Sequence, residues 1–345
     1  MGVNLTPIIL KRTLSINDLR GKSLAIDANN YLYQFLALIR TPNGMPLKDK
    51  KGNITSHLAG LLFRSTRLIQ DYGIRLVFVF DGKPPKQKEQ EIIKRRERRA
   101  KALTEYSQAL EEGNLTAAWS KAVMTSRLTT SLVEDAKHLL DLLGIPFMQA
   151  PSEAEAQAAF MAEKGDVWAA SSKDYDSLLF GAPRLLRYLT IYGREFYSSK
   201  GTSRPLRPEL MELERILTYY GITRQQLVDI AILIGTDFNR GIKGIGPKTA
   251  LKLVKKNEGI ENLPGSVKSL LTENFKDIRD IFLNPLVTDD YSLDYHEMQE
   301  EELIHFLHEE RDFSLERIKT AINRMKRFYS GKKQVRLVNW FSKDY

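Results

Sequence analysis

The sequence predicts an α/β fold with a mostly parallel central sheet flanked by helices. Three short apolar segments, residues 23–27, 76–81 and 167–174, each end at an aspartate. Short runs of this kind are typical of the buried strands of a parallel sheet. Predicted helices alternate with these strands, which is the pattern of α/β proteins. Ligands of such sheets bind outside the carboxyl ends of the strands, so we expect the three aspartates near a functional site.

Residues 1–82 are expected to form the first half of this core. An opening helix precedes the strand to Asp27, and a helix over residues 31–40 follows it. Residues 41–53 are rich in Gly, Pro, Lys and Asp, which indicates an exposed loop. Another helix then leads to the strand that ends at Asp81.

The rest of the chain divides into three predicted parts. Residues 83–144 are charged and helical, and we interpret them as an insert. Residues 145–330 resume the α/β pattern, with a β-like run over residues 185–197 and mostly helical structure from Leu210 onward. Residues 331–345 are expected to form a basic C-terminal tail.

Composition narrows the class of protein. The chain has 345 residues, no cysteine and a formal net charge of +9. Its length is sufficient for a large core. The positive charge favours a polyanionic partner such as nucleic acid, although a merely basic soluble protein remains the alternative on charge alone. The absence of cysteine excludes disulfides and thiolate metal sites and fits an intracellular protein. No apolar run approaches the roughly 18 residues of a membrane span.

Seven carboxylates are candidates for a metal site. Each has a structural explanation when it is taken alone. Ser152 is a plausible helix N-cap with Glu155 as its capping-box partner, Asp176 is a plausible turn residue, and Asp237 is a plausible helix cap. The set comprises Asp27, Asp81, Glu153, Glu155, Asp174, Asp176 and Asp237.

Taken together, these acids predict bound cations. Two like charges 4 Å apart repel by roughly 4 kcal/mol at an effective dielectric constant of 20. An all-carboxylate set suits hard cations, of which Mg²⁺ is the usual choice and Mn²⁺ a substitute. More acids than one ion can coordinate indicates two ions, an arrangement that supports phosphodiester hydrolysis. A basic protein with such a site is expected to be a nuclease.

Two basic features accompany the acids. Lys88 and Arg95 lie seven residues apart, and on a helix they share a face from which they can grip a scissile phosphate. A solvated charged helix is the alternative. The run Gly-Ile-Gly-Pro-Lys-Thr-Ala that begins at Gly244 resembles the hairpin of a helix–hairpin–helix element near residues 235–256. Its backbone N–H groups, together with Gly246, Lys248 and Thr249, are expected to bind duplex phosphates without reading sequence.

These motifs together resemble those of the flap endonucleases, the structure-specific 5′ nucleases of archaeal and eukaryotic replication. The resemblance runs along the whole chain. Its most specific parts are IDA (26–28), YQFL (33–36), TSHL (55–58), VFDGKPP (79–85), APSEAEA (150–156), DYD (174–176) and IGP (245–247). The opening residues 6–11 diverge from the eukaryotic form, and the residues directly after Asp237 differ from those of many relatives.

The resemblance implies roles for individual residues. It implies that the seven acids coordinate two Mg²⁺ ions, and that Lys88 and Arg95, at the base of a helical arch, engage the scissile phosphate. Tyr33 matches an aromatic residue that stacks on a base of the reacting strand. Arg40 and Arg64 match basic residues near the substrate junction and its 3′-flap pocket. Gly2 matches a small residue that fits beside the active site, and a monovalent cation is implied at the glycine hairpin.

The C-terminal segment resembles a sliding-clamp-binding motif. Its pattern is Q-x-x-L-x-x-aromatic-aromatic, carried by Gln334, Leu337, Trp340 and Phe341. One helical turn would present the apolar side chains to a pocket on the clamp (PCNA). The alternative is a tail whose aromatic residues pack on the chain's own core.

The expected activity is Mg²⁺-dependent cleavage near the junction of a 5′ flap with duplex DNA, in lagging-strand maturation and repair, by a monomeric archaeal-type enzyme with 5′–3′ exonuclease side activity. Three alternatives remain. One is an exonuclease or repair endonuclease of the same superfamily. Another is a non-catalytic DNA-binding clamp adaptor, which would not need all seven carboxylates. The third is a short acidic-site RNase, which would lack the hairpin.

Overall fold

The computed structural model describes the chain except residues 1, 42–43, 126, 190–193, 198–201 and 342–345. At its centre is a seven-stranded sheet with the strand order β1-β9-β6-β5-β2-β3-β4. The five strands β6, β5, β2, β3 and β4 are parallel. On the other side of the sheet, β9 is antiparallel to β6, and β1 is antiparallel to β9. In chain order the strands are β1 (Arg12–Thr13), β2 (Ser23–Asp27), β3 (Arg75–Phe80), β4 (Phe147–Gln149), β5 (Ala169–Ser171), β6 (Arg184–Arg187) and β9 (Glu209–Glu212). The predicted α/β class with a mostly parallel sheet is confirmed.

Helices cover both faces of the sheet, because its strands are apolar on both sides. In β2, Leu24 and Ile26 face one core while Ala25 faces the other. The first core is closed by α1 (Ala28–Leu38), α2 (Ser56–Tyr72), α5 (Thr130–Leu142) and α14 (Leu315–Phe341). The second is closed by α6 (Ala154–Glu163), α7 (Asp176–Leu179), α8 (Leu213–Tyr220) and α9 (Arg224–Ile234). Burial on both faces is expected for parallel strands.

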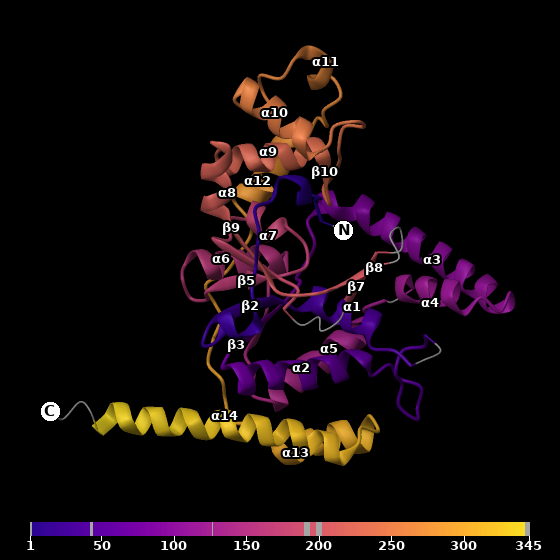
Figure 1. The fold of residues 1–345 in the computed structure, drawn as a ribbon, viewed down its shortest axis with the longest axis vertical. Coiled ribbons are helices and arrows are strands. Elements are labelled where there is room, and N and C mark those ends of the chain that lie inside the picture. Colours follow the sequence, from indigo (N-terminus) through magenta and orange to yellow (C-terminus); the bar gives the residue numbers. More distant parts are fainter. Residues whose placement is uncertain (1, 42–43, 126, 190–193, 198–201, 342–345) are drawn as a thin grey trace.

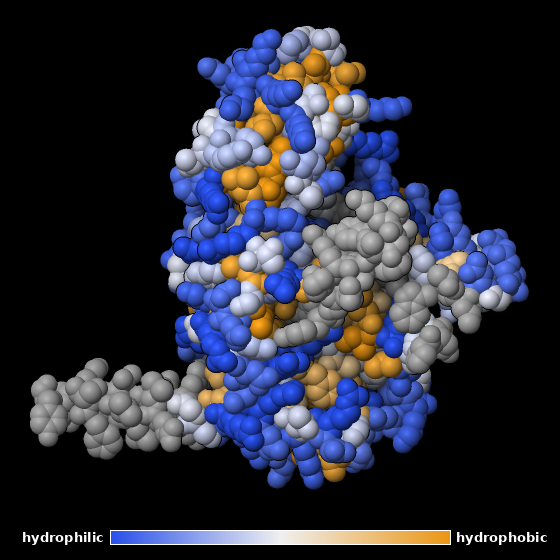
Figure 2. All heavy atoms as spheres, in the orientation of Figure 1, coloured by the Kyte–Doolittle hydropathy of each residue, from blue (hydrophilic) through white to orange (hydrophobic). Residues whose placement is uncertain are grey.

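Two structures project from this core (Figure 1). The helices α3 (Glu89–Glu111) and α4 (Leu115–Met124) form a helical hairpin that extends away from the sheet. The side chains of α3 are mostly hydrophilic, as the face shown in Figure 2 also indicates. A second group, α10 (Pro247–Asn257), α11 (Gly265–Lys268) and α12 (Phe275–Leu283), forms the upper lobe beside α9.

An irregular strap, residues 284–299, joins the upper lobe to the C-terminal helices. It is anchored by side chains that bond its backbone or that of the sheet. The Gln157 amide donates to Thr288 O (2.8 Å) and accepts from Thr288 N (2.9 Å). The Tyr295 hydroxyl accepts from Leu76 N (2.7 Å) and donates to Leu76 O (3.0 Å). After the strap come α13 (Glu300–Ile304) and the π-helical segment His305–Glu310.

Several expectations about individual elements were wrong. The opening helix is only a 3₁₀ turn, η1 (Thr6–Ile8). The first long helix begins at Ala28 and not at residue 31, because the Asp27 side chain caps it by accepting from Asn30 N. The run 185–197 is split between β6 and β7 (Arg194–Tyr197), which pairs with β8 (Thr202–Pro205).

The predicted boundaries also need adjustment. Leu210 lies in strand β9 and not in a helix. Helix α5, which was assigned to the insert, buries Leu139 and Leu140 in the core, so the projecting part ends before it. In the described backbone, α14 runs on to Phe341 through most of the predicted tail, and Figure 1 shows it extending beyond the body of the molecule.

Helices α1 and α2 approach closely because Gly60 has no side chain. A Cβ at this position would lie 2.2 Å from Phe35 Cγ. Overpacking a core costs about 1–3 kcal/mol. This exceeds the roughly 1 kcal/mol that alanine gains over glycine within a helix.

We therefore expect Gly60→Ala to lower the free energy of unfolding. Gly331→Ala is the matched control, because Gly331 is also helical but has no atom within 4 Å of the Cβ position. That variant is expected to be neutral or slightly more stable. Urea unfolding followed by circular dichroism measures both, and an unchanged midpoint for Gly60→Ala would contradict the packing argument.

Candidate active site

The fold brings the predicted acids to the carboxyl edge of the sheet. The paired register of β2 places Asp27 opposite Val79 of β3, and Ile26 opposite Ser171 of β5. The acids come from five places in the chain: Asp27 ends β2, Asp81 follows β3, Glu153 and Glu155 begin α6, Asp174 and Asp176 lie just before and at the start of α7, and Asp237 lies between β10 (Gly235–Thr236) and β11 (Asn239–Arg240).

Burial and mutual repulsion make this cluster electrostatically unfavourable. Asp27, Glu153, Asp176 and Asp237 are each less than a tenth exposed. Burial, followed by the charges of Asp81 and Asp174, raises the pKa of Asp27 well above its usual value. Burial and the charge of Asp176 do the same for the pKa of Glu155. Burial, then the charges of Asp237 and Asp174, raises the pKa of Asp176 to about 7.

The structural explanations for single acids do not hold. Helix α6 has Glu153 at its N-cap and no side-chain capping bond, so the predicted pairing of Ser152 with Glu155 is absent. Glu155 Oε1 is instead buried without a hydrogen-bond partner among the described residues. Asp237 lies in the turn of a short β-hairpin and does not cap a helix. Asp176 Oδ1 accepts from Val3 N (3.1 Å), which ties the N-terminal segment to the site.

Two asparagines that the sequence analysis missed hold part of the cluster. The Asn29 amide donates to Asp81 Oδ2 (2.8 Å), and the Asn30 amide donates to Asp174 Oδ2 (3.2 Å). The only signal in the sequence was their position directly after the strand-end Asp27. The second oxygen of Asp81 accepts from Ala154 N at 2.9 Å.

Lys88 and Arg95 reach the acids from the base of the α3–α4 hairpin. Lys88 ends the 3₁₀ turn η3 (Lys86–Lys88) and donates to Glu153 Oε2, while its Nζ lies 3.8 Å from Asp237 Oδ2. Arg95 donates to the same Asp237 oxygen from two turns further along. Burial opposes the charge on Lys88, but the carboxylates of Glu153 and Asp81 outweigh it and raise its pKa. The two cations therefore face the site on one side of the helix.

The residues present fit a hard divalent cation. Among the described residues, no three acidic or histidine side chains form a ready metal-binding group. Two of the acids, Glu153 and Asp237, are engaged by Lys88 and Arg95. The remaining donors are carboxylate oxygens, and the buried Glu155 Oε1 lacks a partner in the described structure. Such an oxygen-only set is the kind that Mg²⁺ and Ca²⁺ prefer.

Gly2 lies against the cluster, where the sequence analysis placed a small residue. A Cβ at this position would lie 2.7 Å from Asp176 Oδ1 and 2.9 Å from Asp174 Cβ. Any larger side chain would therefore displace an acid.

The glycine hairpin follows Asp237 in the chain and lies between β11 and α10. Gly246 is the N-cap of α10, Pro247 is its first residue, and no side chain caps the first turn. No described atom lies within 4 Å of the Cβ position at Gly244 or Gly246. Lys248 and Thr249 are exposed on the first turn. The hairpin thus leaves backbone N–H groups and a helix N-terminus open to an anion.

Tyr33 lies on α1, Arg40 lies just after the end of that helix, and Arg64 lies on α2. Tyr33 is 39% exposed, and the Arg64 guanidinium stacks on the Phe35 ring with 5.9 Å to the ring centre. Arg40 donates to Gly44 O (2.7 Å) and Ala37 O (3.1 Å), and burial lowers its pKa.

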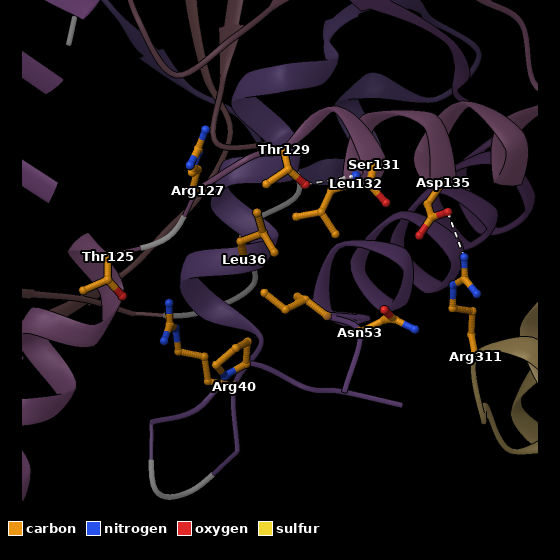
Figure 3. A pocket seen from close by; sticks show the side chains of 12 residues that line it. Leu36, Arg40, Asn53, Thr125, Arg127, Thr129, Ser131, Leu132, Asp135 and Arg311 are labelled. Atoms are coloured by element: carbon orange, nitrogen blue, oxygen red, sulfur yellow. Dashed lines mark hydrogen bonds and ion pairs between the residues drawn. The ribbon is translucent and has the colours of Figure 1, made fainter. Parts of the chain in front are cut away.

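Arg40 also lines a pocket of about 410 Å³ between α1 and α5 (Figure 3). Arg127 lies across it, and the ion pair between Asp135 and Arg311 (2.9 Å) closes one end. The sequence analysis missed Arg127 and Arg311, because neither lies in a recognisable motif. The side chains of Gln334, Leu337, Trp340 and Phe341 lie outside the described part of the chain.

The raised pKa values predict a pH-dependent stability when metal is removed. A carboxyl group with a folded pKa near 7 and an ordinary pKa in the unfolded chain favours folding only while it is protonated, so stability falls as the pH rises from about 4 to above 7. We expect Asp176→Asn to be more stable than the unchanged protein at pH 8 in EDTA, by about 1–4 kcal/mol, and similar at pH 4. Chemical unfolding at both pH values measures this, and equal differences at the two would refute it.

Comparisons with known proteins identify the family of the chain. Family models described as the XPG N-terminal domain and the XPG I-region match residues 1–102 and 144–237. Flap endonuclease 1 of Hyperthermus butylicus is 49% identical over 334 residues, which cover 95% of each chain. Flap endonuclease 1 of Pyrococcus abyssi is 48% identical over 99% of each chain.

Comparison with solved structures indicates the same family and fold. Flap endonuclease-1 from Methanococcus jannaschii superposes with a TM-score of 0.75 at 41% identity, covering 96% of this chain and all of that one. The catalytic core of Rad2 in complex with a DNA substrate shares the fold, with a TM-score of 0.66 at 23% identity over 91% of this chain and 96% of that one. No described helix is both long and apolar enough to cross a membrane. From its identity to these relatives and its fold, the chain belongs to the flap endonuclease family and is of the archaeal type.

Proposed function

We propose that this chain is a structure-specific nuclease that cleaves a phosphodiester near the junction of a 5′ flap with duplex DNA, using two Mg²⁺ ions. The observation that carries the proposal is the meeting of the buried acids with Lys88 and Arg95 at one edge of the sheet. The acids suit hard cations, and the basic pair suits a phosphate. A nuclease needs both at the same place.

The divalent ions would be held by Asp27, Asp81, Glu153, Glu155, Asp174, Asp176 and Asp237. When bound, such ions lower the pKa of a water molecule and stabilise the leaving oxygen. The protein itself holds the carboxylates at fixed positions, and their burial limits the access of water to the site. Gly2 leaves these acids in place, because a Cβ at this position would meet Asp174 and Asp176.

Lys88 and Arg95 are proposed to exchange partners when DNA binds. In the structure they bind Glu153 and Asp237. Divalent ions would neutralise those carboxylates, and the two side chains would then turn to the scissile phosphate. The basic pair offsets negative charge in either state.

DNA contacts outside the acidic site are proposed from geometry and charge. Gly244, Gly246, Lys248 and Thr249 present backbone N–H groups and positive charge to the downstream duplex, and a monovalent cation at this hairpin is part of the same proposal. Tyr33 offers an exposed ring for stacking on a base, and Arg40 and Arg64 lie on the neighbouring helices. The C-terminal residues Gln334, Leu337, Trp340 and Phe341 are proposed to bind a sliding clamp, and the enzyme to act as a monomer in replication and repair.

The first test is cleavage of a labelled double-flap DNA beside single-stranded, blunt and gapped controls. We expect one cut at the flap junction that requires Mg²⁺ and is abolished by EDTA. Asp174→Ala should lose more than 100-fold in rate while flap binding is kept or improved, because a negative charge near the DNA is removed. Asp71→Ala, an exposed acid paired with Arg67 on α2, is the control. An equal loss of binding and rate in Asp174→Ala would argue against a metal role.

A second test asks whether Lys88 acts through its specific position or only through the overall positive charge of this region. Lys88→Met should lower the single-turnover rate by about 100-fold or more with little change in flap affinity, because the lost contact is to the reacting phosphate. Lys86→Met removes the same charge two residues away, from an exposed side chain, and should leave the rate nearly unchanged. If both variants lost rate equally, only the overall charge of the hairpin base would matter.

A further inference from the structure

The start of α1 places two amide side chains against acids that come from other parts of the chain. Asn29 bonds Asp81, which follows β3, and Asn30 bonds Asp174, which follows β5. Asn30 N also donates to Asp27 Oδ1 at 2.9 Å. One helical turn therefore contacts three strand-end carboxylates at once.

The orientation of the Asn30 amide is fixed from behind. Gln34, one turn later on α1, donates from Nε2 to Asn30 Oδ1 at 2.6 Å. Because the Asn30 oxygen is occupied, its NH₂ group is the part that faces Asp174. The three side chains form a chain of amide hydrogen bonds that ends on a carboxylate.

Asn29 has a complementary arrangement. Its NH₂ group holds Asp81 Oδ2, while Ala154 N holds Asp81 Oδ1. Each oxygen of Asp81 therefore has one donor from the protein and keeps lone-pair capacity for a further partner. Asn29 Oδ1 is buried and has no hydrogen-bond partner among the described residues, so the amide leaves one more oxygen acceptor beside Asp81.

Neutral donors act differently from Lys88 and Arg95. A basic side chain bound to a carboxylate opposes a cation at the same place and must leave before one binds. An asparagine amide fixes the carboxylate without adding charge, so it can stay while a cation is coordinated. Partners of this kind typically change metal affinity by 10- to 100-fold.

We propose that Asn29 and Asn30 are positioning residues that hold Asp81 and Asp174 in the orientation needed to coordinate a divalent cation, and that Gln34 orients Asn30 for this role. The inference rests on the proposed metal-dependent function of the same acids. It assigns no catalytic step to the amides, which act only through the carboxylates that they bind.

The test is a titration of the DNA-free protein with Mn²⁺, followed by electron paramagnetic resonance of the free ion. Asn29→Leu and Asn30→Leu keep a similar side-chain volume but cannot hydrogen-bond. Each is expected to weaken Mn²⁺ binding by about 10-fold or more. Gln34→Leu, which removes the support of Asn30 without touching a described carboxylate, should weaken it by a smaller factor. The matched control is Asn17→Leu on an exposed 3₁₀ turn, where affinity should not change.

Flap cleavage gives a second, separate readout. For the three α1 variants, the Mn²⁺ concentration at half-maximal rate should rise, and the rate at saturating Mn²⁺ should recover toward that of the unchanged enzyme. A role only in folding would instead lower the fraction of active protein without moving the half-saturating concentration. Thermal unfolding in EDTA identifies any variant that does not fold, and Gln34→Leu then carries the test for Asn30.

The outcomes are distinct. Unchanged Mn²⁺ affinity in all folded α1 variants, or an equal loss in Asn17→Leu, would overturn the inference. A shifted affinity in a protein that cleaves no flap DNA would support the inference and reject the proposed activity. If the unchanged protein bound no Mn²⁺ at all, the inference would fall with the metal site.

Discussion

The mutual repulsion of the acids at the carboxyl edge of the sheet is the constraint on which the rest of the site depends. The fold places seven carboxyl groups from five parts of the chain at this edge, several of them almost without exposure to water. Burial and like charges raise the pKa of Asp27, Glu155 and Asp176. A cluster of this kind is stable in its ionised form only when cations share the space. In the structure, two of those cations are side chains of the protein itself, Lys88 and Arg95.

This arrangement links the helical hairpin to the contents of the site. Lys88 and Arg95 lie at the base of α3–α4, and they hold the hairpin to the body through Glu153 and Asp237. Further out, the Tyr106 hydroxyl of α3 bonds Met45 Sδ at 3.1 Å, which connects the hairpin to the loop after α1. The same few contacts therefore determine both the charge balance at the site and the position of the hairpin relative to the core. Under the proposed function, a cation that neutralised Glu153 and Asp237 would also release the basic pair to another anion.

The sequence predicted the parts of the molecule whose physical signal is local. Buried strands such as β2 and β3 are recognisable because their apolar runs are continuous, and the acids were found because three of them end such runs. Elements that depend on distant partners were missed. Strand β9 depends on its pairing with β6, and the opening segment forms only a 3₁₀ turn. The roles of Asn29 and Asn30 were missed because an uncharged amide has no pattern of its own, and their partners are 52 and 144 residues away. A predicted capping box at Ser152 was wrong because position 155 faces the acidic cluster.

The way in which the α3–α4 hairpin joins the core has a consequence for how such proteins diversify. The hairpin leaves the core just after β3 and returns at α5, and both attachment points are fixed by buried strands and helices. Among the described residues between these points, Lys88 and Arg95 bind Glu153 and Asp237. The part of the hairpin beyond Arg95 is held by other contacts, such as the bond from Tyr106 to Met45, so its length and surface can change without altering the contacts to the acids. The contacts of the basic pair with the acids and the outer surface of the hairpin are thus encoded in separate stretches of one polypeptide, so selection can alter the second without rebuilding the first.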